Sequence, residues 1–509
     1  MNPNLQRTIV TGSIMLATIM QTLDSTIANV ALPHMQGSFS ATQEQIAWVL
    51  TSYIVAAAVF TPTTGFLATR LGRRNLLASA VIGFTVASML CGAATSLSEI
   101  VLFRLLQGMF GAALVPLSQA ILLDTYPPEK HGAAMAVWGM GVMVGPILGP
   151  ALGGWLTDAY SWRWVFYINV PFGLLALAGI FAASSEAPVD KSRRFDWQGF
   201  AYLGLSIAGL QIMLDRGQVQ DWFSSTEIIV EAGIAAIAFF LFIVHSMTTK
   251  NPFITLHLFR DRNLVVGLVL ITVVGVVLFA TMALLPPYLE TLMGYPVVTT
   301  GLVLAPRGIG TMIAMFLVGR LVNRIDIRLI MAFGMLLTIY SLWEMSRFNL
   351  YIDEGMIVTT GVIQGFGLGF IFVPLTTATF ATLSPELRTE GTSLYSLMRN
   401  IGSSAGISIT QALISRYTQI NHEILSRNVS ELNPLLRPEH APPGWDVQTM
   451  QGLALAEGEV TRQAASIAYL NDFKLMMYLT LLALPLLLLL RTPRHGQAAS
   501  SEMPAAHLD

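Results

Sequence analysis

Two charged side chains lie inside long apolar stretches of this sequence, where they could take part in proton transfer. Asp24 lies late in the apolar stretch 8–33, and Arg104 lies in the stretch 99–122. A carboxylate inside a membrane is costly, so it is usually paired, protonated or functional. Arginine keeps its charge and needs an anion or several acceptors there. We predict proton coupling at Asp24, modulated by Arg104. The alternatives are a structural hydrogen bond or headgroup position for Asp24, and an Arg104 side chain that reaches the membrane interface.

Five further polar residues of the apolar stretches are candidates for a substrate path or for bridges between helices. Arg307 and Arg399 are guanidinium groups at membrane depth, and extension of either side chain to the membrane interface is an equally good interpretation. Asn29, Gln107 and Gln364 are uncharged hydrogen-bonding groups in the same kind of surroundings.

A glycine- and proline-rich stretch near residue 150 predicts a helix that packs closely against a neighbour. Glycines four residues apart share one helix face and allow close approach, while prolines kink the helix. Such a face could seal or pivot a cavity between helical bundles, and ordinary packing explains the same residues. The residues concerned are Gly141, Gly145, Pro146, Gly149, Pro150, Gly153 and Gly154.

A basic loop at residues 65–74 is a candidate conformational latch on the cytoplasmic side. Its arginines could pair with acids or helix ends there, and they also act as a topology signal. The residues concerned are Gly65, Arg70, Gly72, Arg73 and Arg74.

The composition identifies the class of protein in which these residues act. Of the 509 residues, 54% are hydrophobic and 11% are charged, and the mean hydropathy is +0.62. Soluble domains carry about 25% charged residues. An ordinary cytosolic enzyme, a disordered protein and a nucleic-acid binder are therefore excluded, which leaves a polytopic membrane protein. The single cysteine allows no intramolecular disulfide and no cysteine-based zinc site. There is no Walker A or H-E-x-x-H motif, so we predict no enzymatic activity, no catalytic residue, no metal and no cofactor, with the proton-motive force as energy source.

Fourteen apolar stretches are long enough to cross a bilayer, which takes about 20 residues each. Lys and Arg concentrate in alternate loops, which predicts cytoplasmic N- and C-termini. The predicted spans are 8–33, 45–68, 75–96, 99–122, 133–156, 164–184, 198–214, 226–246, 264–287, 297–319, 329–347, 355–380, 392–415 and 472–490.

An internal repeat divides the chain. The basic loop that begins at Gly65 has a counterpart that begins at Gly319, 254 residues later, and Gln107-Gly108 has a counterpart at Gln364-Gly365. This offset exceeds the length of six spans, which predicts two six-helix bundles with two helices inserted between them. The predicted parts are an N-terminal bundle (1–190), the inserted pair (191–262), a C-terminal bundle (263–495) with a long periplasmic loop (416–470), and a cytoplasmic tail (496–509).

Together these motifs resemble those of the major facilitator superfamily, and in particular the fourteen-span drug:proton antiporters of the EmrB type. The resemblance covers nearly the whole chain apart from the long loop and the tail. One departure is Thr69, where the superfamily loop usually has an aspartate, so the arginines of the loop need another acidic partner. The segments that carry the resemblance are the loop 65–74, Arg104 with Gln107 and Gly108, the helix 141–154, the segments 24–33 and 209–225, and the segment 126–130.

The resemblance implies an all-α major facilitator fold and proton-driven export of lipophilic toxic compounds across a bacterial inner membrane. It also implies a periplasmic membrane-fusion adaptor and an outer-membrane channel as partners. The alternatives are an exporter of one metabolite, lipid or siderophore with the same fold and, from another class, a non-transporting membrane scaffold or sensor.

Overall fold

The computed structural model describes residues 3–183, 194–322, 324–429, 433, 436 and 449–491, and within these residues the secondary structure is helical, with no strand. The predicted tail 496–509 and the predicted boundary at residues 190 and 191 lie outside the described residues.

The first part of the chain forms nine helical segments, here called the N-terminal bundle. Three predicted spans are broken helices: α2 and α3 meet at an angle of 60°, α5 and α6 are separated by Ala112 and Ala113, and α8 and α9 are separated by Ile168. The segments are α1 (Pro3–Phe39), α2 (Gln43–Phe60), α3 (Thr63–Leu71), α4 (Arg73–Ala93), α5 (Leu97–Gly111), α6 (Leu114–Thr125), α7 (His131–Ala159), α8 (Trp164–Tyr167) and α9 (Asn169–Ala183).

The rest of the chain forms an inserted pair of helices and a second group, here called the C-terminal bundle. The inserted helices are α10 (Trp197–Arg216) and α11 (Thr226–Thr248). The C-terminal bundle comprises α12 (Arg262–Pro287), which a π-helical turn (Tyr288–Leu292) extends, α13 (Val297–Leu321), α14 (Ile327–Met345), α15 (Glu354–Phe380), α16 (Arg388–Ser426) and α17 (Met450–Ala483).

Each of the fourteen predicted stretches coincides with a helix or a broken helix pair of this structure. Ten helices within the described ranges are long and apolar enough to cross a membrane, or eleven if the bent pair α2–α3 is one span. Helices α1, α10 and α16 are not among the ten. The structure is therefore that of a polytopic membrane protein, and the count of fourteen spans stays a prediction.

The internal repeat reappears in the packing of the two bundles. A Cβ on Gly108 of α5 would lie 2.4 Å from the carbonyl oxygen of Tyr53 on α2, and a Cβ on Gly365 of α15 would lie 2.0 Å from the carbonyl oxygen of Arg307 on α13. Only glycine permits so close an approach between helix backbones. Tyr53 and Arg307 are 254 residues apart, which is the offset of the two basic loops.

The two bundles meet through α7 and α13, and through α16 against α3 and α6. The inserted helix α10 packs against α2 of the N-terminal bundle and α16 of the C-terminal bundle. Polar contacts accompany this packing, because Gln211 Nε2 donates to Ser404 Oγ at 2.9 Å and Ser408 Oγ donates to the carbonyl of Leu214 at 2.5 Å. Helix α10 of the inserted pair thus connects the two bundles.

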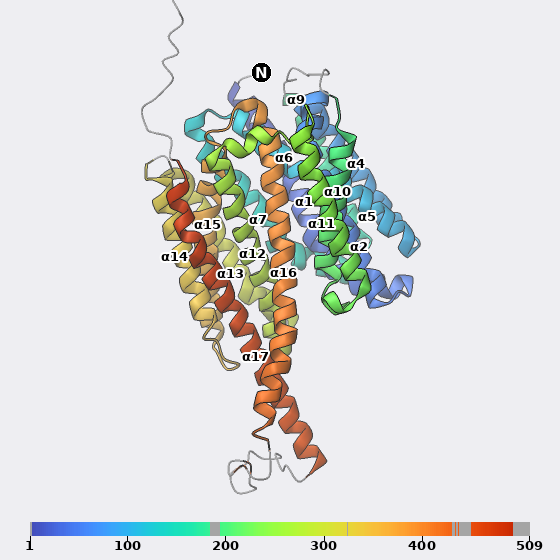
Figure 1. The fold of residues 1–509 in the computed structure, drawn as a ribbon, viewed down its shortest axis with the longest axis vertical. Helices are drawn as coiled ribbons and strands as arrows, with labels where there is room; N and C mark the ends of the chain where they lie inside the picture. Colours follow the sequence, from blue (N-terminus) through green and yellow to red (C-terminus); the bar gives the residue numbers. More distant parts are fainter. Residues whose placement is uncertain are drawn as a thin grey trace, which may run out of the picture.

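Helices α16 and α17 are longer than their predicted spans and leave the rest of the molecule as a pair, at the bottom of the view in Figure 1. The predicted long loop 416–470 is therefore helical up to Ser426 and again from Met450. A search for apolar stretches could not detect these extensions, because polar side chains hold the two helices together there. Asn421 donates to the carbonyl of Ala464, and His422 contacts Glu457. Most of the intervening segment 430–448 lies outside the described residues.

Candidate proton-coupling and transport site

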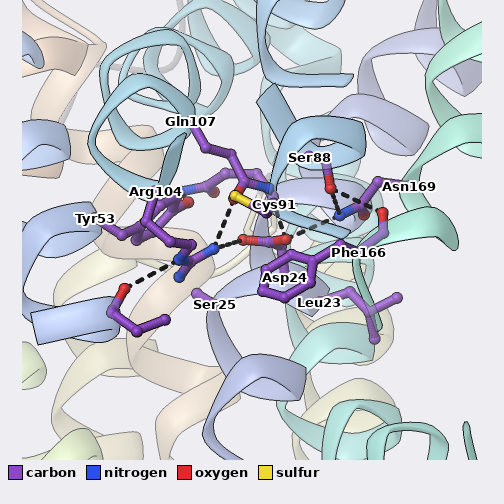
Figure 2. Close-up of polar contacts among 12 residues, drawn as sticks. Leu23, Asp24, Ser25, Tyr53, Ser88, Cys91, Arg104, Gln107, Phe166 and Asn169 are labelled. Atoms are coloured by element: carbon purple, nitrogen blue, oxygen red, sulfur yellow. Dashed lines mark hydrogen bonds and ion pairs between the residues drawn. The ribbon is translucent and has the colours of Figure 1, made fainter. Parts of the chain in front are cut away.

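Asp24 and Arg104 form an ion pair inside the N-terminal bundle (Figure 2). Arg104 Nη1 lies 2.6 Å from Asp24 Oδ2, and both residues are fully buried. They come from α1 and α5, 80 residues apart in the chain. Two opposite charges that are both removed from solvent are tolerated only when they are paired and further hydrogen-bonded.

Two amide side chains complete the shell around the carboxylate. Gln107 Nε2 donates to Asp24 Oδ1 at 2.8 Å, and Asn169 Nδ2 donates to the same oxygen at 2.9 Å. Asn169 also donates to Ser88 Oγ at 2.9 Å, and Ser88 in turn donates to the carbonyl of Phe166 at 2.8 Å (Figure 2). Asp24 therefore receives three donors from helices α5 and α9, which suits an ionised, acceptor-only carboxylate.

Other contacts fix the guanidinium of Arg104 from the opposite side. Arg104 Nε donates to the carbonyl of Val49 at 3.1 Å, and its Cζ lies 4.1 Å from the centre of the Tyr53 ring. Gly108, one turn further along α5, allows this approach because its missing side chain leaves room for the α2 backbone. The attraction between the guanidinium and the tyrosine ring stabilises such a site by about 0.5–2 kcal/mol.

The glycine face of α7 packs against α1, the helix that carries Asp24. A Cβ on Gly145 would lie 2.5 Å from the carbonyl carbon of Thr22, and one on Gly149 would lie 2.1 Å from Thr26 Oγ1. Thr26 Oγ1 also donates to the carbonyl of Gly145 at 3.0 Å. Gly141 and Gly153 face α1 as well, whereas a Cβ on Gly154 would have its nearest neighbour at 4.0 Å. Pro146 and Pro150 lie within the same helix.

The basic loop lies between the bundles, at the end of the molecule that we call the latch face, where α3 meets the first turn of α16. Arg73 pairs with Asp124, at the end of α6, and Arg388 of α16 contacts the other oxygen of that carboxylate at 2.7 Å. Arg73 Nη2 also donates to the carbonyl of Pro385 at 2.9 Å. Asp124 thus supplies an acid to the loop, while Thr69 makes only a local hydrogen bond among the described residues, to the carbonyl of Gly65 at 3.0 Å.

The other residues of the loop have different surroundings. Gly72 joins α3 to α4 at a φ of 81°, a left-handed conformation that favours glycine. A Cβ on Gly65 would lie 3.0 Å from Glu390 Cα in the first turn of α16. The Arg74 guanidinium lies 5.6 Å from the centre of the Phe181 ring, and Arg70 is exposed.

The polar candidates outside the Asp24 cluster are dispersed. Arg307 is buried and bridges two helices, because its Nη2 donates to Thr281 Oγ1 of α12 at 2.8 Å. Arg399 is half-buried on α16 and pairs with no carboxylate of the described residues. Gln364 is fully buried, and its amide has no hydrogen-bond partner there. Asn29 is exposed, one and a half turns from Asp24.

The sequence prediction missed two members of this arrangement. Asn169, which bonds Asp24, is an amide residue within the apolar stretch 164–184, and the rule applied to Gln107 would have singled it out. Asp124 follows an apolar stretch like any solvated residue, so nothing local marks it as a partner of Arg73. Among the described residues, no group of three or more His, Cys, Asp and Glu side chains is placed to hold a metal ion.

This arrangement, a helical membrane protein with a repeated bundle and a buried charge pair, defines a class of membrane transporter. Residues 14–407 match the model of the Major Facilitator Superfamily, and the chain belongs to that family. The chain is 38% identical to the Multidrug export protein EmrB of Escherichia coli (strain K12), over 91% of this chain and 93% of that protein. It is 35% identical to the Fatty acid resistance protein FarB of Neisseria gonorrhoeae, over 96% of each chain.

Two solved structures share the fold at low sequence identity. The human organic anion transporter MFSD10 superposes with a TM-score of 0.58 at 14% identity, over 94% of this chain and all of that one. A bacterial homologue of the human lysosomal transporter Spinster, in an inward-facing conformation, gives a TM-score of 0.52 at 19% identity, over 96% and 99% of the two chains.

Proposed function

We propose that this chain is a multidrug efflux transporter that exchanges lipophilic toxic compounds for protons across a bacterial inner membrane. Membership of the superfamily and 38% identity to a multidrug export protein over nearly the whole chain support export. The single observation that carries proton coupling is the buried Asp24–Arg104 pair. The proposal is transport without a chemical reaction, with the proton-motive force as energy source.

The geometry around Asp24 gives the coupling a physical basis. Its two carboxylate oxygens accept from Arg104, Gln107 and Asn169, so this conformation holds the ionised form. A proton on Asp24 removes the negative charge that holds the Arg104 guanidinium in its buried place. Protonation of Asp24 therefore favours rearrangement of α1 against α5, and the glycine face of α7 transmits this rearrangement because it packs directly on α1.

The latch face supplies the second half of the cycle. Arg73 and Arg388 hold Asp124 between the two bundles, so the bundles are closed against each other at this end. The basic residues here are the basis for the predicted cytoplasmic orientation of the latch face and of both termini. A closed cytoplasmic side together with an ionised Asp24 corresponds to a transporter that has discharged its proton and awaits the next one.

The partners follow from the same reasoning. An exporter that works with a periplasmic membrane-fusion adaptor and an outer-membrane channel needs a surface outside the membrane, and the extensions of α16 and α17 offer one. We expect the full chain to pull down such an adaptor. A chain whose segment 416–470 is replaced by a short linker should not pull it down.

The test of export uses purified protein in liposomes loaded with ethidium. An imposed pH gradient should drive ethidium movement that vanishes when a protonophore collapses the gradient. The same rate in liposomes without the protein would contradict the proposal, and would favour a scaffold or sensor.

A second candidate function, export of lipophilic carboxylates, is favoured by the charge of the C-terminal bundle. Arg307 and Arg399 lie at membrane depth there, and neither has a carboxylate partner among the described residues. A guanidinium without an anion is a natural partner for the carboxylate of a substrate. The 35% identity to a fatty acid resistance protein agrees with this candidate. Stronger inhibition of ethidium transport by a long-chain fatty acid than by its methyl ester would support it, and equal inhibition would exclude it.

A further inference from the structure

Helix α17 carries a second buried carboxyl group, Asp472, far along the chain from Asp24. Tyr469, Asp472, Phe473 and Met476 are spaced at three and four residues, so they share one face of α17. All four are buried, and Asp472 itself is 1% exposed. The face packs into an aromatic cluster of the C-terminal bundle, where the Tyr288 and Tyr469 rings lie 5.6 Å apart.

Asp472 differs from Asp24 because it has no partner. Neither of its oxygens has a hydrogen-bond donor among the described residues. The titratable group beside it is the phenol of Tyr469 on its own helix, and the Tyr469 ring in turn contacts Tyr288 on the π-helical turn that extends α12. Lys474 of the same helix is exposed.

The neighbouring elements supply no counter-charge either. No ion pair joins Asp472 to a charged side chain of the described elements packed against α17. Those side chains are Arg262 of α12, Glu290 of the π-helical turn, Arg328 and Glu344 of α14, and Arg388, Glu390, Arg399, Arg416, His422 and Glu423 of α16.

An ionised carboxylate in such a place would cost several kcal/mol, whereas the neutral acid loses only a hydrogen bond. A metal cation is a poor occupant, because hard cations need about six oxygen ligands and Asp472 is one residue in an aromatic surrounding. We propose that Asp472 is a second proton-binding site, protonated in this conformation and deprotonated when the C-terminal bundle rearranges during transport.

This inference rests on the proposed proton exchange, and it assigns opposite protonation states to the two buried acids in one conformation. Asp24 is ionised beside Arg104, while Asp472 holds a proton. A cycle that alternates both groups would move more protons per exported molecule than a cycle that uses Asp24 alone.

The first test is infrared spectroscopy of the full-length protein in lipid at neutral pH. The carbonyl stretch of a protonated carboxylic acid should be present in the unsubstituted protein and lost in Asp472→Asn. It should persist in Glu457→Gln, which removes an exposed carboxylate of the same helix. Asp472→Glu keeps a carboxyl group and should shift the band, so it replaces Asp472→Asn if the latter fails to fold. A band unchanged in both Asp472 variants would overturn the proposal.

The second test is the ratio of protons to ethidium in reconstituted vesicles. Asp472→Asn should still exchange ethidium for protons, but with fewer protons per ethidium than the unsubstituted protein. An unchanged ratio would overturn the role of Asp472 in transport and would leave the proposed function intact. The proposed function itself fails if the unsubstituted protein moves ethidium no faster than protein-free vesicles do, or moves no protons with it.

Discussion

Removal of Arg104 should destabilise the protein strongly, and removal of both charges of the pair should destabilise it less than the two single changes combined. Arg104→Met leaves the fully buried Asp24 carboxylate with only the amide donors of Gln107 and Asn169. Breaking a buried ion pair from one side costs about 3–5 kcal/mol, because one charge stays buried without compensation. Asp24→Asn still leaves the Arg104 guanidinium with the Val49 carbonyl and Gln107 as acceptors. We therefore expect this variant to lose unfolding free energy at the lower end of that range.

The double variant Asp24→Asn, Arg104→Met has no uncompensated charge. We therefore expect its loss of unfolding free energy to be about 0.5–3 kcal/mol smaller than the sum of the single losses, which is the usual coupling energy of residues in contact. Unfolding by titration with SDS in mixed micelles, followed by tryptophan fluorescence, measures all four proteins of the cycle. A double variant whose loss equals the sum of the singles would refute the pair as an energetic unit.

Three further perturbations test the helix contacts around the site. Gly145→Ala should lower the free energy of unfolding by about 1–3 kcal/mol and reduce ethidium transport, because the new Cβ would lie 2.5 Å from the backbone of α1. Gly154→Ala on the same helix should change neither property. Equal effects of the two substitutions would contradict close packing as the reason for the glycines. Asp124→Asn should raise amide hydrogen exchange in the first turns of α16, because it weakens both arginine contacts at the latch face, and the exposed Asp158→Asn should not. Gln211→Ala should lower the free energy of unfolding by about 1 kcal/mol and alter the transport rate, because it removes a hydrogen bond between α10 and α16. An unaltered rate would argue against the inserted pair as a connection between the bundles.

The sequence predicted much of the site because charge inside an apolar stretch is rare and costly. This rule singled out Asp24 and Arg104 and led to the prediction that Arg104 modulates Asp24, and the structure brings the two side chains into contact. The glycine spacing around Gly145 predicted a close helix contact, and the structure identifies α1 as the neighbour. For the glycine face the residue types predicted a need for a neighbour, while the identity of that neighbour depended on tertiary packing.

What the sequence could not predict depends on distant contacts or on polar helices. Asp124 becomes a partner of Arg73 only when α6 packs against α4, and of Arg388 only when α6 meets α16. The extensions of α16 and α17 have little hydropathy, so the search for apolar stretches ended at residue 415, resumed at residue 472 and predicted a loop between them. Asp472 opens the last apolar stretch, where an acid suggests the end of a span, and only the packing of α17 shows that it is buried.

Substrate-induced proton release tests the central claim, coupling at Asp24, most directly. Purified protein in weakly buffered detergent solution is first held at a pH where Asp24 carries a proton, and ethidium is then added while a pH indicator dye records protons. The unsubstituted protein should release protons on addition of ethidium, and Asp24→Asn should bind ethidium with a smaller release. The same number of protons released by both proteins would contradict the assignment of coupling to Asp24.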